Sequence, residues 1–152
     1  MVKLEEKIKE DLNKALKNQQ ELLVSTLRFL LSEIYNAQTQ KQKDLSDEEI
    51  FAVIRRQIKQ REEAIPLYQK GGRHDLADKE KEEQRILSNY LPQEISSLDL
   101  EKMVSQIIEE LGVLGKPETF GQVMGAVMAK VKGRAEGKQI AEMVKNLLAK
   151  DS

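Results

Sequence analysis

Apolar residues recur at intervals of three and four along almost the whole chain, and this spacing predicts an all-α protein. A first helical face steps through residues 4–16, and a second extends over residues 20–39. The strict alternation of a half-buried β-strand is almost absent. We therefore expect helices packed on helices, with a core built from Leu, Ile, Val and Met because aromatic residues make up only 4% of the chain.

The start of a third helix is well marked. Ser46 and Glu49 have the spacing of a capping box, in which each side chain accepts a hydrogen bond from the other residue's backbone N–H. Leu45 and Ile50 occupy the two positions of a hydrophobic staple. Pro66 is expected to kink or end this helix, because its ring removes a donor and clashes with the preceding turn.

A fourth helix is expected over about residues 73–90, after the glycine pair at 71–72. Its inner face is thin, and its outer face is a run of alternating acids and bases. Glu80, Glu82 and Glu83 belong to this run. A catalytic carboxylate needs shielding to raise its pKa, so we interpret these three as solvated side chains that support the helix and its solubility.

The segment 90–97 is the expected domain boundary, because Pro92 and the residues after it interrupt every periodic pattern. Residues 1–94 are predicted to form an N-terminal helical bundle of about four helices. Residues 95–152 are predicted to form a small three-helix C-terminal domain, with Ser97 capping its first helix. A domain of this size has a small core.

An apolar ladder from Phe120 to Val131 predicts the middle helix of this tail, and it runs into a glycine-punctuated cationic segment. Residues 112–150 carry seven basic and three acidic side chains, so a polyanion would meet this end of the chain first. We call residues 130–138 the basic turn. The six candidate RNA-binding residues in it are Lys130, Lys132, Gly133, Arg134, Gly137 and Lys138.

Two interpretations of the basic turn stay open from the residues alone. In the structural one, Gly133 is a left-handed helix cap, and Lys130 complements the dipole at that helix end. In the functional one, the next helix begins near Gly137, so its free N–H groups face the same region as the cations and suit phosphate. Aromatic residues are not interleaved here, which favours the backbone of folded RNA over single-stranded bases.

Composition removes several classes of function. The chain has no cysteine and only one histidine, His74, which excludes disulfides, thiol nucleophiles and His-rich metal sites. We expect no catalytic residues, no metal and no cofactor, and we expect His74 to face solvent. No apolar run approaches the length of a membrane span, and the N-terminus lacks the core of a signal peptide, so a cytoplasmic protein without membrane contact is predicted.

Three long segments resemble the YqeY-like family, which shares a domain with the tail of the B subunit of glutamyl/aspartyl-tRNA amidotransferase. They are TLRFLLSEIYNAQ at 26–38, YQKGGRHDLADKEKEEQRILSNYLPQEIS at 68–96 and GQVMGAVMAKVKGRAEGKQIAEMV at 121–144. The resemblance covers nearly the whole chain. It implies an N-terminal helical domain followed by a three-helix tail, and it links residues 95–152 to a domain associated with gripping the tRNA body.

The resemblance implies three functions. The first is a non-catalytic tRNA-binding module that uses the basic turn. The second is a protein–protein adaptor that docks on an aminoacyl-tRNA synthetase or amidotransferase subunit. The third, glutamine-dependent carbon–nitrogen ligation, has the least support, because the chain lacks a thiol and any nucleotide-binding loop. A monomer or weak oligomer is expected.

Overall fold

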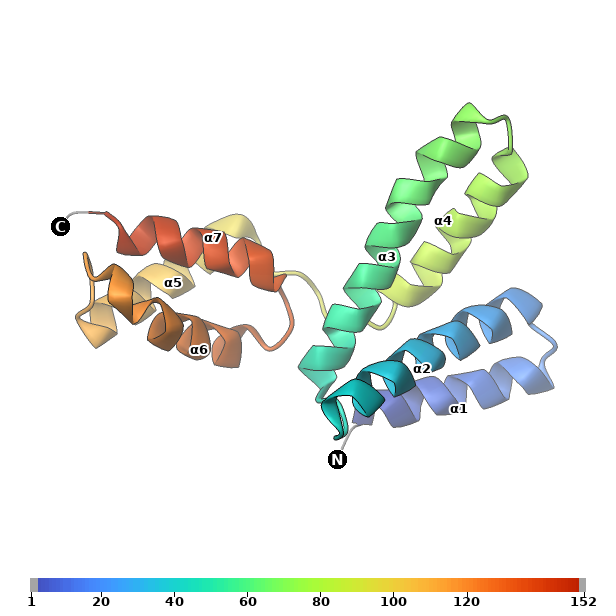
Figure 1. The fold of residues 1–152 in the computed structure, drawn as a ribbon, viewed down its shortest axis with the longest axis horizontal. Helices are drawn as coiled ribbons and strands as arrows, with labels where there is room; N and C mark the ends of the chain where they lie inside the picture. Colours follow the sequence, from blue (N-terminus) through green and yellow to red (C-terminus); the bar gives the residue numbers. More distant parts are fainter. Residues whose placement is uncertain (1–2, 151–152) are drawn as a thin grey trace. The chain divides into compact units, whose positions relative to one another are not determined.

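The computed structural model describes residues 3–150, and these residues form seven α-helices, one 3₁₀ turn and no strand (Figure 1). The all-α prediction is therefore confirmed. One compact unit ends at Leu91 and a second begins at Pro92, and we call them the N-terminal and C-terminal units. The elements are α1 Lys3–Lys17, α2 Glu21–Lys41, α3 Asp47–Lys70, α4 His74–Ser88, α5 Ser97–Leu111, η1 Pro117–Thr119, α6 Phe120–Val131 and α7 Gly137–Leu148.

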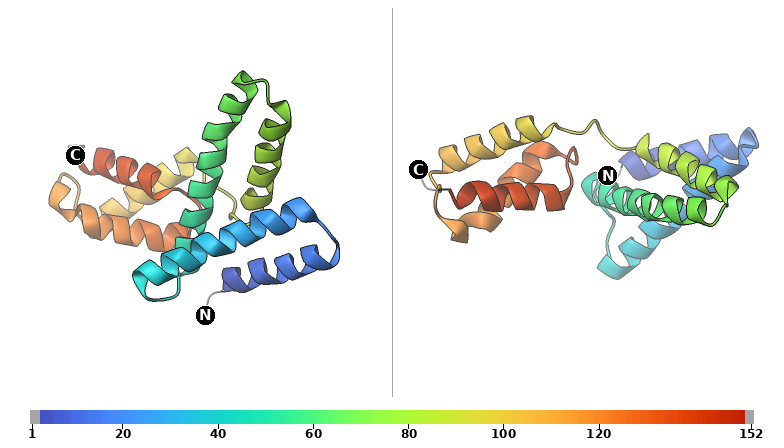
Figure 2. Two further views of the ribbon diagram at one scale, coloured as in Figure 1. Left: turned by 45° about the vertical axis from the view of Figure 1, so that its right-hand side comes forward. Right: turned by 90° about the horizontal axis from the view of Figure 1, so that it is seen from above.

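The N-terminal unit consists of two antiparallel helical hairpins, α1–α2 and α3–α4, as Figures 1 and 2 show. Their apolar stripes meet in a core where burial of aliphatic side chains is the main stabilising term. Each hairpin supplies one wall of this core. The fully or nearly buried members are Leu4, Ile8, Leu27, Leu30, Ile34, Leu45, Ile50, Val53, Ile54, Ile86 and Leu87.

The capping box at the start of α3 is confirmed. The backbone N–H of Glu49 donates to Ser46 Oγ at 3.2 Å, and the backbone N–H of Ser46 donates to Glu49 Oε1 at 3.0 Å. Leu45 and Ile50 are both buried in the same core, as the staple requires. The first turn of α3 is thus fixed by its own sequence.

Pro66 does not end α3, which continues to Lys70 before Gly71 caps it. The proline deprives one carbonyl, that of Glu62, of its helical donor. Both Pro66 and Glu62 are exposed, so this carbonyl is open to solvent. With only four helical residues after Pro66, packing against α4 outweighs the lost hydrogen bond.

A buried polar network joins α3 to α4 around Arg61. The Arg61 guanidinium donates through Nε to Glu83 Oε2 at 3.0 Å and through Nη1 to Gln57 Oε1 at 3.0 Å. Gln57 and Arg61 are 2% and 8% exposed, and the guanidinium carbon lies 5.9 Å from the centre of the Phe29 ring on α2. This network adds polar contacts to the packing of α3 against α4.

The prediction that Glu80, Glu82 and Glu83 are solvated is wrong for two of the three. Glu80 and Glu83 are largely buried and face Arg61, with the Glu80 carboxylate 3.8 Å from Arg61 Nε. Burial, and then repulsion from Glu83, raises the pKa of Glu80. Glu82 remains accessible and pairs with Arg85 on the outer face of α4. The guanidinium explains the burial, because it donates a hydrogen bond to Glu83 and places an opposite charge 3.8 Å from the Glu80 carboxylate.

A second long-range contact closes the N-terminal unit. The Tyr90 hydroxyl donates to Asp11 Oδ2 on α1 at 2.6 Å, which ties the end of α4 to the first helix. Burial, and then this hydrogen bond, raises the pKa of Tyr90 well above its ordinary value. The phenol therefore stays neutral and acts as a donor across the ordinary pH range.

The C-terminal unit packs α5, α6 and α7 around a separate core. Its first helix is capped by Ser96, one residue before the expected Ser97, and the Asp99 N–H donates to Ser96 Oγ at 3.1 Å. No buried residue is shared with the N-terminal core among residues 3–150. The buried members are Leu100, Val104, Ile107, Ile108, Val113, Val123, Val127, Val131, Ala135, Ile140, Val144, Leu147 and Leu148.

Candidate functional site

The basic turn connects α6 to α7, and its first residue after the helix is strained. Lys132 caps α6 in the left-handed conformation, with φ of 50°, and its N–H donates to the Met128 carbonyl at 3.2 Å. Gly133 follows with φ of 82° and is half-buried. The left-handed cap was expected at Gly133, and the structure has it one residue earlier. A lysine in this conformation costs about 1–2 kcal/mol because Cβ approaches the carbonyl oxygen.

Lys132→Gly is therefore expected to stabilise the C-terminal unit by about 0.5–1 kcal/mol, since relief of this strain exceeds the extra chain entropy of glycine. The matched control is Lys130→Gly in the last turn of α6, where glycine should destabilise by a similar amount. Urea unfolding followed by circular dichroism measures both. Equal destabilisation by the two variants would contradict the assigned backbone conformation.

Arg134 has a structural role in the turn in addition to its charge. Its Nε donates to the Gln93 carbonyl at 3.0 Å, and its own carbonyl accepts from the Ile95 N–H at 2.9 Å. These two bonds hold the segment that leads into α5 against the basic turn. The next residue, Ala135, is buried in the core of the unit. Arg134 thus fixes the turn while most of its five guanidinium donors remain available.

Helix α7 begins at Gly137 without a side-chain cap. Its N-cap residue, Glu136, makes no side-chain capping bond. The first helical bond is from the Ile140 N–H to the Glu136 carbonyl at 3.0 Å, so the three preceding N–H groups have no helical acceptor. Lys138 lies in this first turn and is exposed. Backbone donors and an ammonium group therefore lie close together, as anion binding requires.

Charges are paired very differently in the two units. The ion pairs within 4.0 Å that the structure shows all join residues of the N-terminal unit. Lys130, Lys132 and Lys138 are exposed, and none has an ion pair or side-chain hydrogen bond with any residue of 3–150. Their charges are not compensated locally, so they create a positive potential around the turn.

The outer face of α6 differs from expectation. Met128 was expected to pack inward and is 43% exposed. Gly121 and Gly125 also lie on α6. Both are exposed, and a Cβ at either position would meet no atom within 4 Å. Within the C-terminal unit these glycines are not used for close packing.

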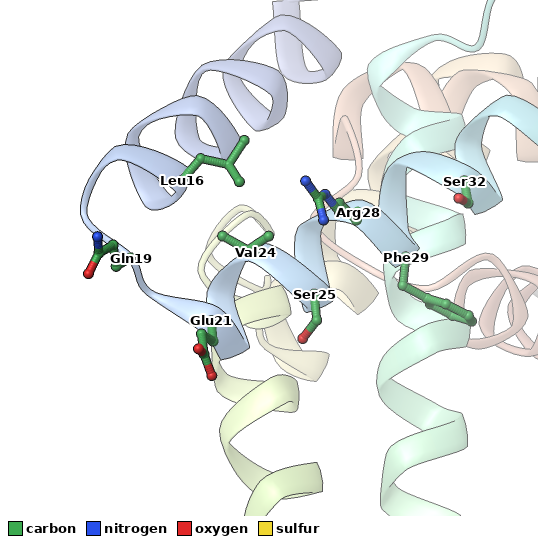
Figure 3. A pocket seen from close by; sticks show the side chains of 8 residues that line it. All are labelled: Leu16, Gln19, Glu21, Val24, Ser25, Arg28, Phe29 and Ser32. Atoms are coloured by element: carbon green, nitrogen blue, oxygen red, sulfur yellow. The ribbon is translucent and has the colours of Figure 1, made fainter.

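A groove of about 700 Å³ lies on the α1–α2 hairpin of the N-terminal unit. Figure 3 shows Leu16 on α1 opposite Val24 on α2, with Phe29 extending toward α3. Arg28 and Glu21 are its only ionisable lining residues, so it lacks a shielded acid–base pair. Across residues 3–150 there is no group of three acidic or histidine side chains that could hold a metal. No helix there is long and apolar enough to cross a membrane. His74 is exposed, as predicted.

A match to a known protein family identifies the family of this chain. The sequence pattern of the family described as Yqey-like protein matches residues 5–148. The chain belongs to the YqeY-like family. The family match therefore covers helices of both units described above.

Several fungal proteins are relatives of this YqeY-like chain. It is 27% identical to altered inheritance of mitochondria protein 41 of Pyrenophora tritici-repentis, covering 85% of this chain and 71% of that protein. It is 32% identical to the protein of the same name in Vanderwaltozyma polyspora, covering 76% and 66%. An uncharacterized protein of Schizosaccharomyces pombe is 33% identical over 60% of this chain and 74% of its own length.

These relatives correct the prediction of a cytoplasmic location. Those from Pyrenophora, Vanderwaltozyma and Lachancea are named as mitochondrial proteins. The prediction rested on the lack of a signal-peptide core and of a membrane span, and neither feature separates the cytoplasm from the mitochondrial matrix. It was therefore wrong to infer the compartment from these absences.

Proposed function

We propose that this YqeY-like protein is a non-catalytic module whose C-terminal unit binds the phosphate backbone of folded RNA through the basic turn. One observation carries the proposal: Lys130, Lys132 and Lys138 are exposed and unpaired beside the open N-terminus of α7. Charges of this kind release counterions from a polyanion at little cost, because no internal ion pair has to break first.

The absence of a stacking surface at the turn favours folded RNA. Phe120 is the only aromatic residue between 112 and 150, and it packs against the core of the unit. Single-stranded RNA is usually gripped by aromatic side chains on which its bases stack. Transfer RNA is the species to test first, since the tail resembles a domain associated with the tRNA body.

The experiment is a salt titration of tRNA binding by the full chain. The Lys130→Gln, Lys132→Gln, Lys138→Gln triple variant should bind about 10- to 100-fold more weakly at low salt. The slope of log K against log salt concentration should fall by roughly 2–3, because each neutralised phosphate contributes about 0.7–0.9. Arg134 is left unchanged because its bond to Gln93 holds the turn.

The matched control replaces three other exposed lysines of the same unit with glutamine, namely Lys102, Lys116 and Lys145. It makes the same change in net charge and should retain most of the affinity. Equal loss in both variants would show that net charge, and not the turn, is responsible. If the wild-type protein shows no salt-sensitive binding to total tRNA at low ionic strength, the proposal is wrong.

A further inference from the structure

A second surface of the C-terminal unit lies between α5 and α7, which run side by side in the same direction (Figure 2). Two hollows of about 560 and 350 Å³ adjoin there. They share Glu101, Leu147 and Lys150, so they form one continuous depression, which we call the α5–α7 groove.

The length of the α5–α7 groove is that of a short helix. Its α5 wall extends from Ser97 to Glu109, and its α7 wall extends from Gln139 to Leu147. At a rise of about 1.5 Å per residue, the α5 wall is about 18 Å long and the α7 wall about 12 Å, or roughly three and two helical turns. A helical segment of about twelve residues would therefore span the longer, α5 wall.

The lining of the groove is apolar in its depth and accessible at one end. Ile108 and Leu147 are 3% and 9% exposed and form part of its base, while Met143 is half-buried. Leu114 is 43% exposed at the end near Gly112. An apolar side chain inserted here would remove leucine and methionine surface from water, which is the main source of affinity in such grooves.

The rim of the groove is acidic. Glu101, Glu109 and Glu142 line it, against the single ammonium group of Lys150. None of the three carboxylates has an ion pair or hydrogen bond with another residue of 3–150. The rim would therefore attract Lys and Arg side chains on a partner and repel phosphate or an anionic membrane.

We propose that the α5–α7 groove binds an amphipathic helix of another protein, about three turns long, with an apolar stripe flanked by Lys or Arg. An extended peptide is a poorer occupant, because both walls are helices whose backbone groups already bond within the helix. A second copy of this chain is also poorer, because its helices bury their apolar stripes in the two cores. The groove contains none of the basic-turn residues, so this proposal does not depend on RNA binding.

The first test uses two synthetic helical peptides of about 16 residues, which is long enough to be partly helical when free. One carries leucines spaced three and four apart with lysines beside them, and in the other every lysine is replaced by glutamate. Both are titrated into the ¹⁵N-labelled full chain. The lysine peptide should shift amide resonances of α5 and α7 and bind at least about tenfold more tightly than the glutamate peptide.

The second test reverses charge on the rim. Glu101→Lys with Glu109→Lys should weaken binding of the lysine peptide at least about tenfold and leave tRNA binding at or above the wild-type level. The matched control, Glu94→Lys with Glu118→Lys, makes the same charge change at exposed positions outside the groove and should bind the peptide almost normally.

Three outcomes would overturn the proposal: resonance shifts outside α5 and α7, equal affinity for the two peptides, or equal loss in the rim variant and its control. Analytical ultracentrifugation tests whether a second copy of this chain occupies the groove. A concentration-dependent dimer that the rim variant abolishes would assign the groove to a second copy of this chain. Circular dichroism of each variant establishes that it is folded.

Discussion

Ile140→Ala is expected to unfold the C-terminal unit under conditions in which the N-terminal unit remains folded. Ile140 is fully buried on α7 in the C-terminal core. Truncation of a buried isoleucine to alanine costs about 2–5 kcal/mol, because apolar contacts are lost and a cavity remains. A unit of roughly 60 residues has only about 3–9 kcal/mol of stability, so this loss removes most of it.

The measurement is a ¹⁵N–¹H spectrum of the full chain during a thermal ramp, since it reports on each unit separately. Resonances of the C-terminal unit should collapse first in the variant, while those of the N-terminal unit persist. Lys145→Ala, an exposed change on the same helix, should leave the order and temperatures of melting close to wild type. A single transition shared by both units would contradict the separation of their cores.

Arg61→Ala is expected to destabilise the N-terminal unit by about 3–5 kcal/mol, because it leaves a buried carboxylate without its counter-charge. Glu83 would lose its 3.0 Å partner, and Glu80 would lose the opposing charge that moderates its raised pKa. Guanidinium chloride unfolding measures the loss. The melting of the C-terminal unit should not change.

Two companion variants distinguish burial from simple pairing. Arg85→Ala removes an exposed pair with Glu82 on the same helix and should have little effect on the unfolding free energy, as is usual for surface ion pairs. The double variant Arg61→Ala, Glu83→Ala should recover part of the loss, because it removes the stranded charge. If Arg61→Ala and Arg85→Ala were equally mild, the buried network would contribute no more than a surface pair.

The helices were predictable because their apolar spacing repeats over many turns, and the capping box fixed the start of α3. Burial on α3 was less predictable. The inward face expected from the apolar spacing runs through Ile50, Val53, Ile54, Ile58 and Ala64, and the last two are only half-buried. Gln57 and Arg61 are buried instead, although they continue the helical steps of Ile50 and Ile54. Polar residues are usually left out when a buried helix face is predicted from a sequence. The burial of Arg61 is explained only by the carboxylates that face it from α4, and Gln57 is buried with it as its hydrogen-bond partner.

The candidate site was predictable in composition and not in geometry. Clustered lysines and glycines were visible in the sequence, and so was the beginning of α7. The bond from Arg134 to the Gln93 carbonyl joins positions 41 residues apart through a backbone acceptor that every residue has, so no pattern could indicate it. The left-handed cap is Lys132, and Gly133, which also has a positive φ, follows it, so the spacing of glycines alone did not fix the last helical residue.

The self-contained construction of the C-terminal unit has an evolutionary consequence. Ser96 caps its first helix, Arg134 fastens its leading segment, and its buried core uses no described residue of the N-terminal unit. We expect a unit with these properties to fold when it is joined near Pro92 to the end of another chain, because its core uses no described residue outside it. Fusion and exchange of such a tail are then limited by its surface partners and not by its folding.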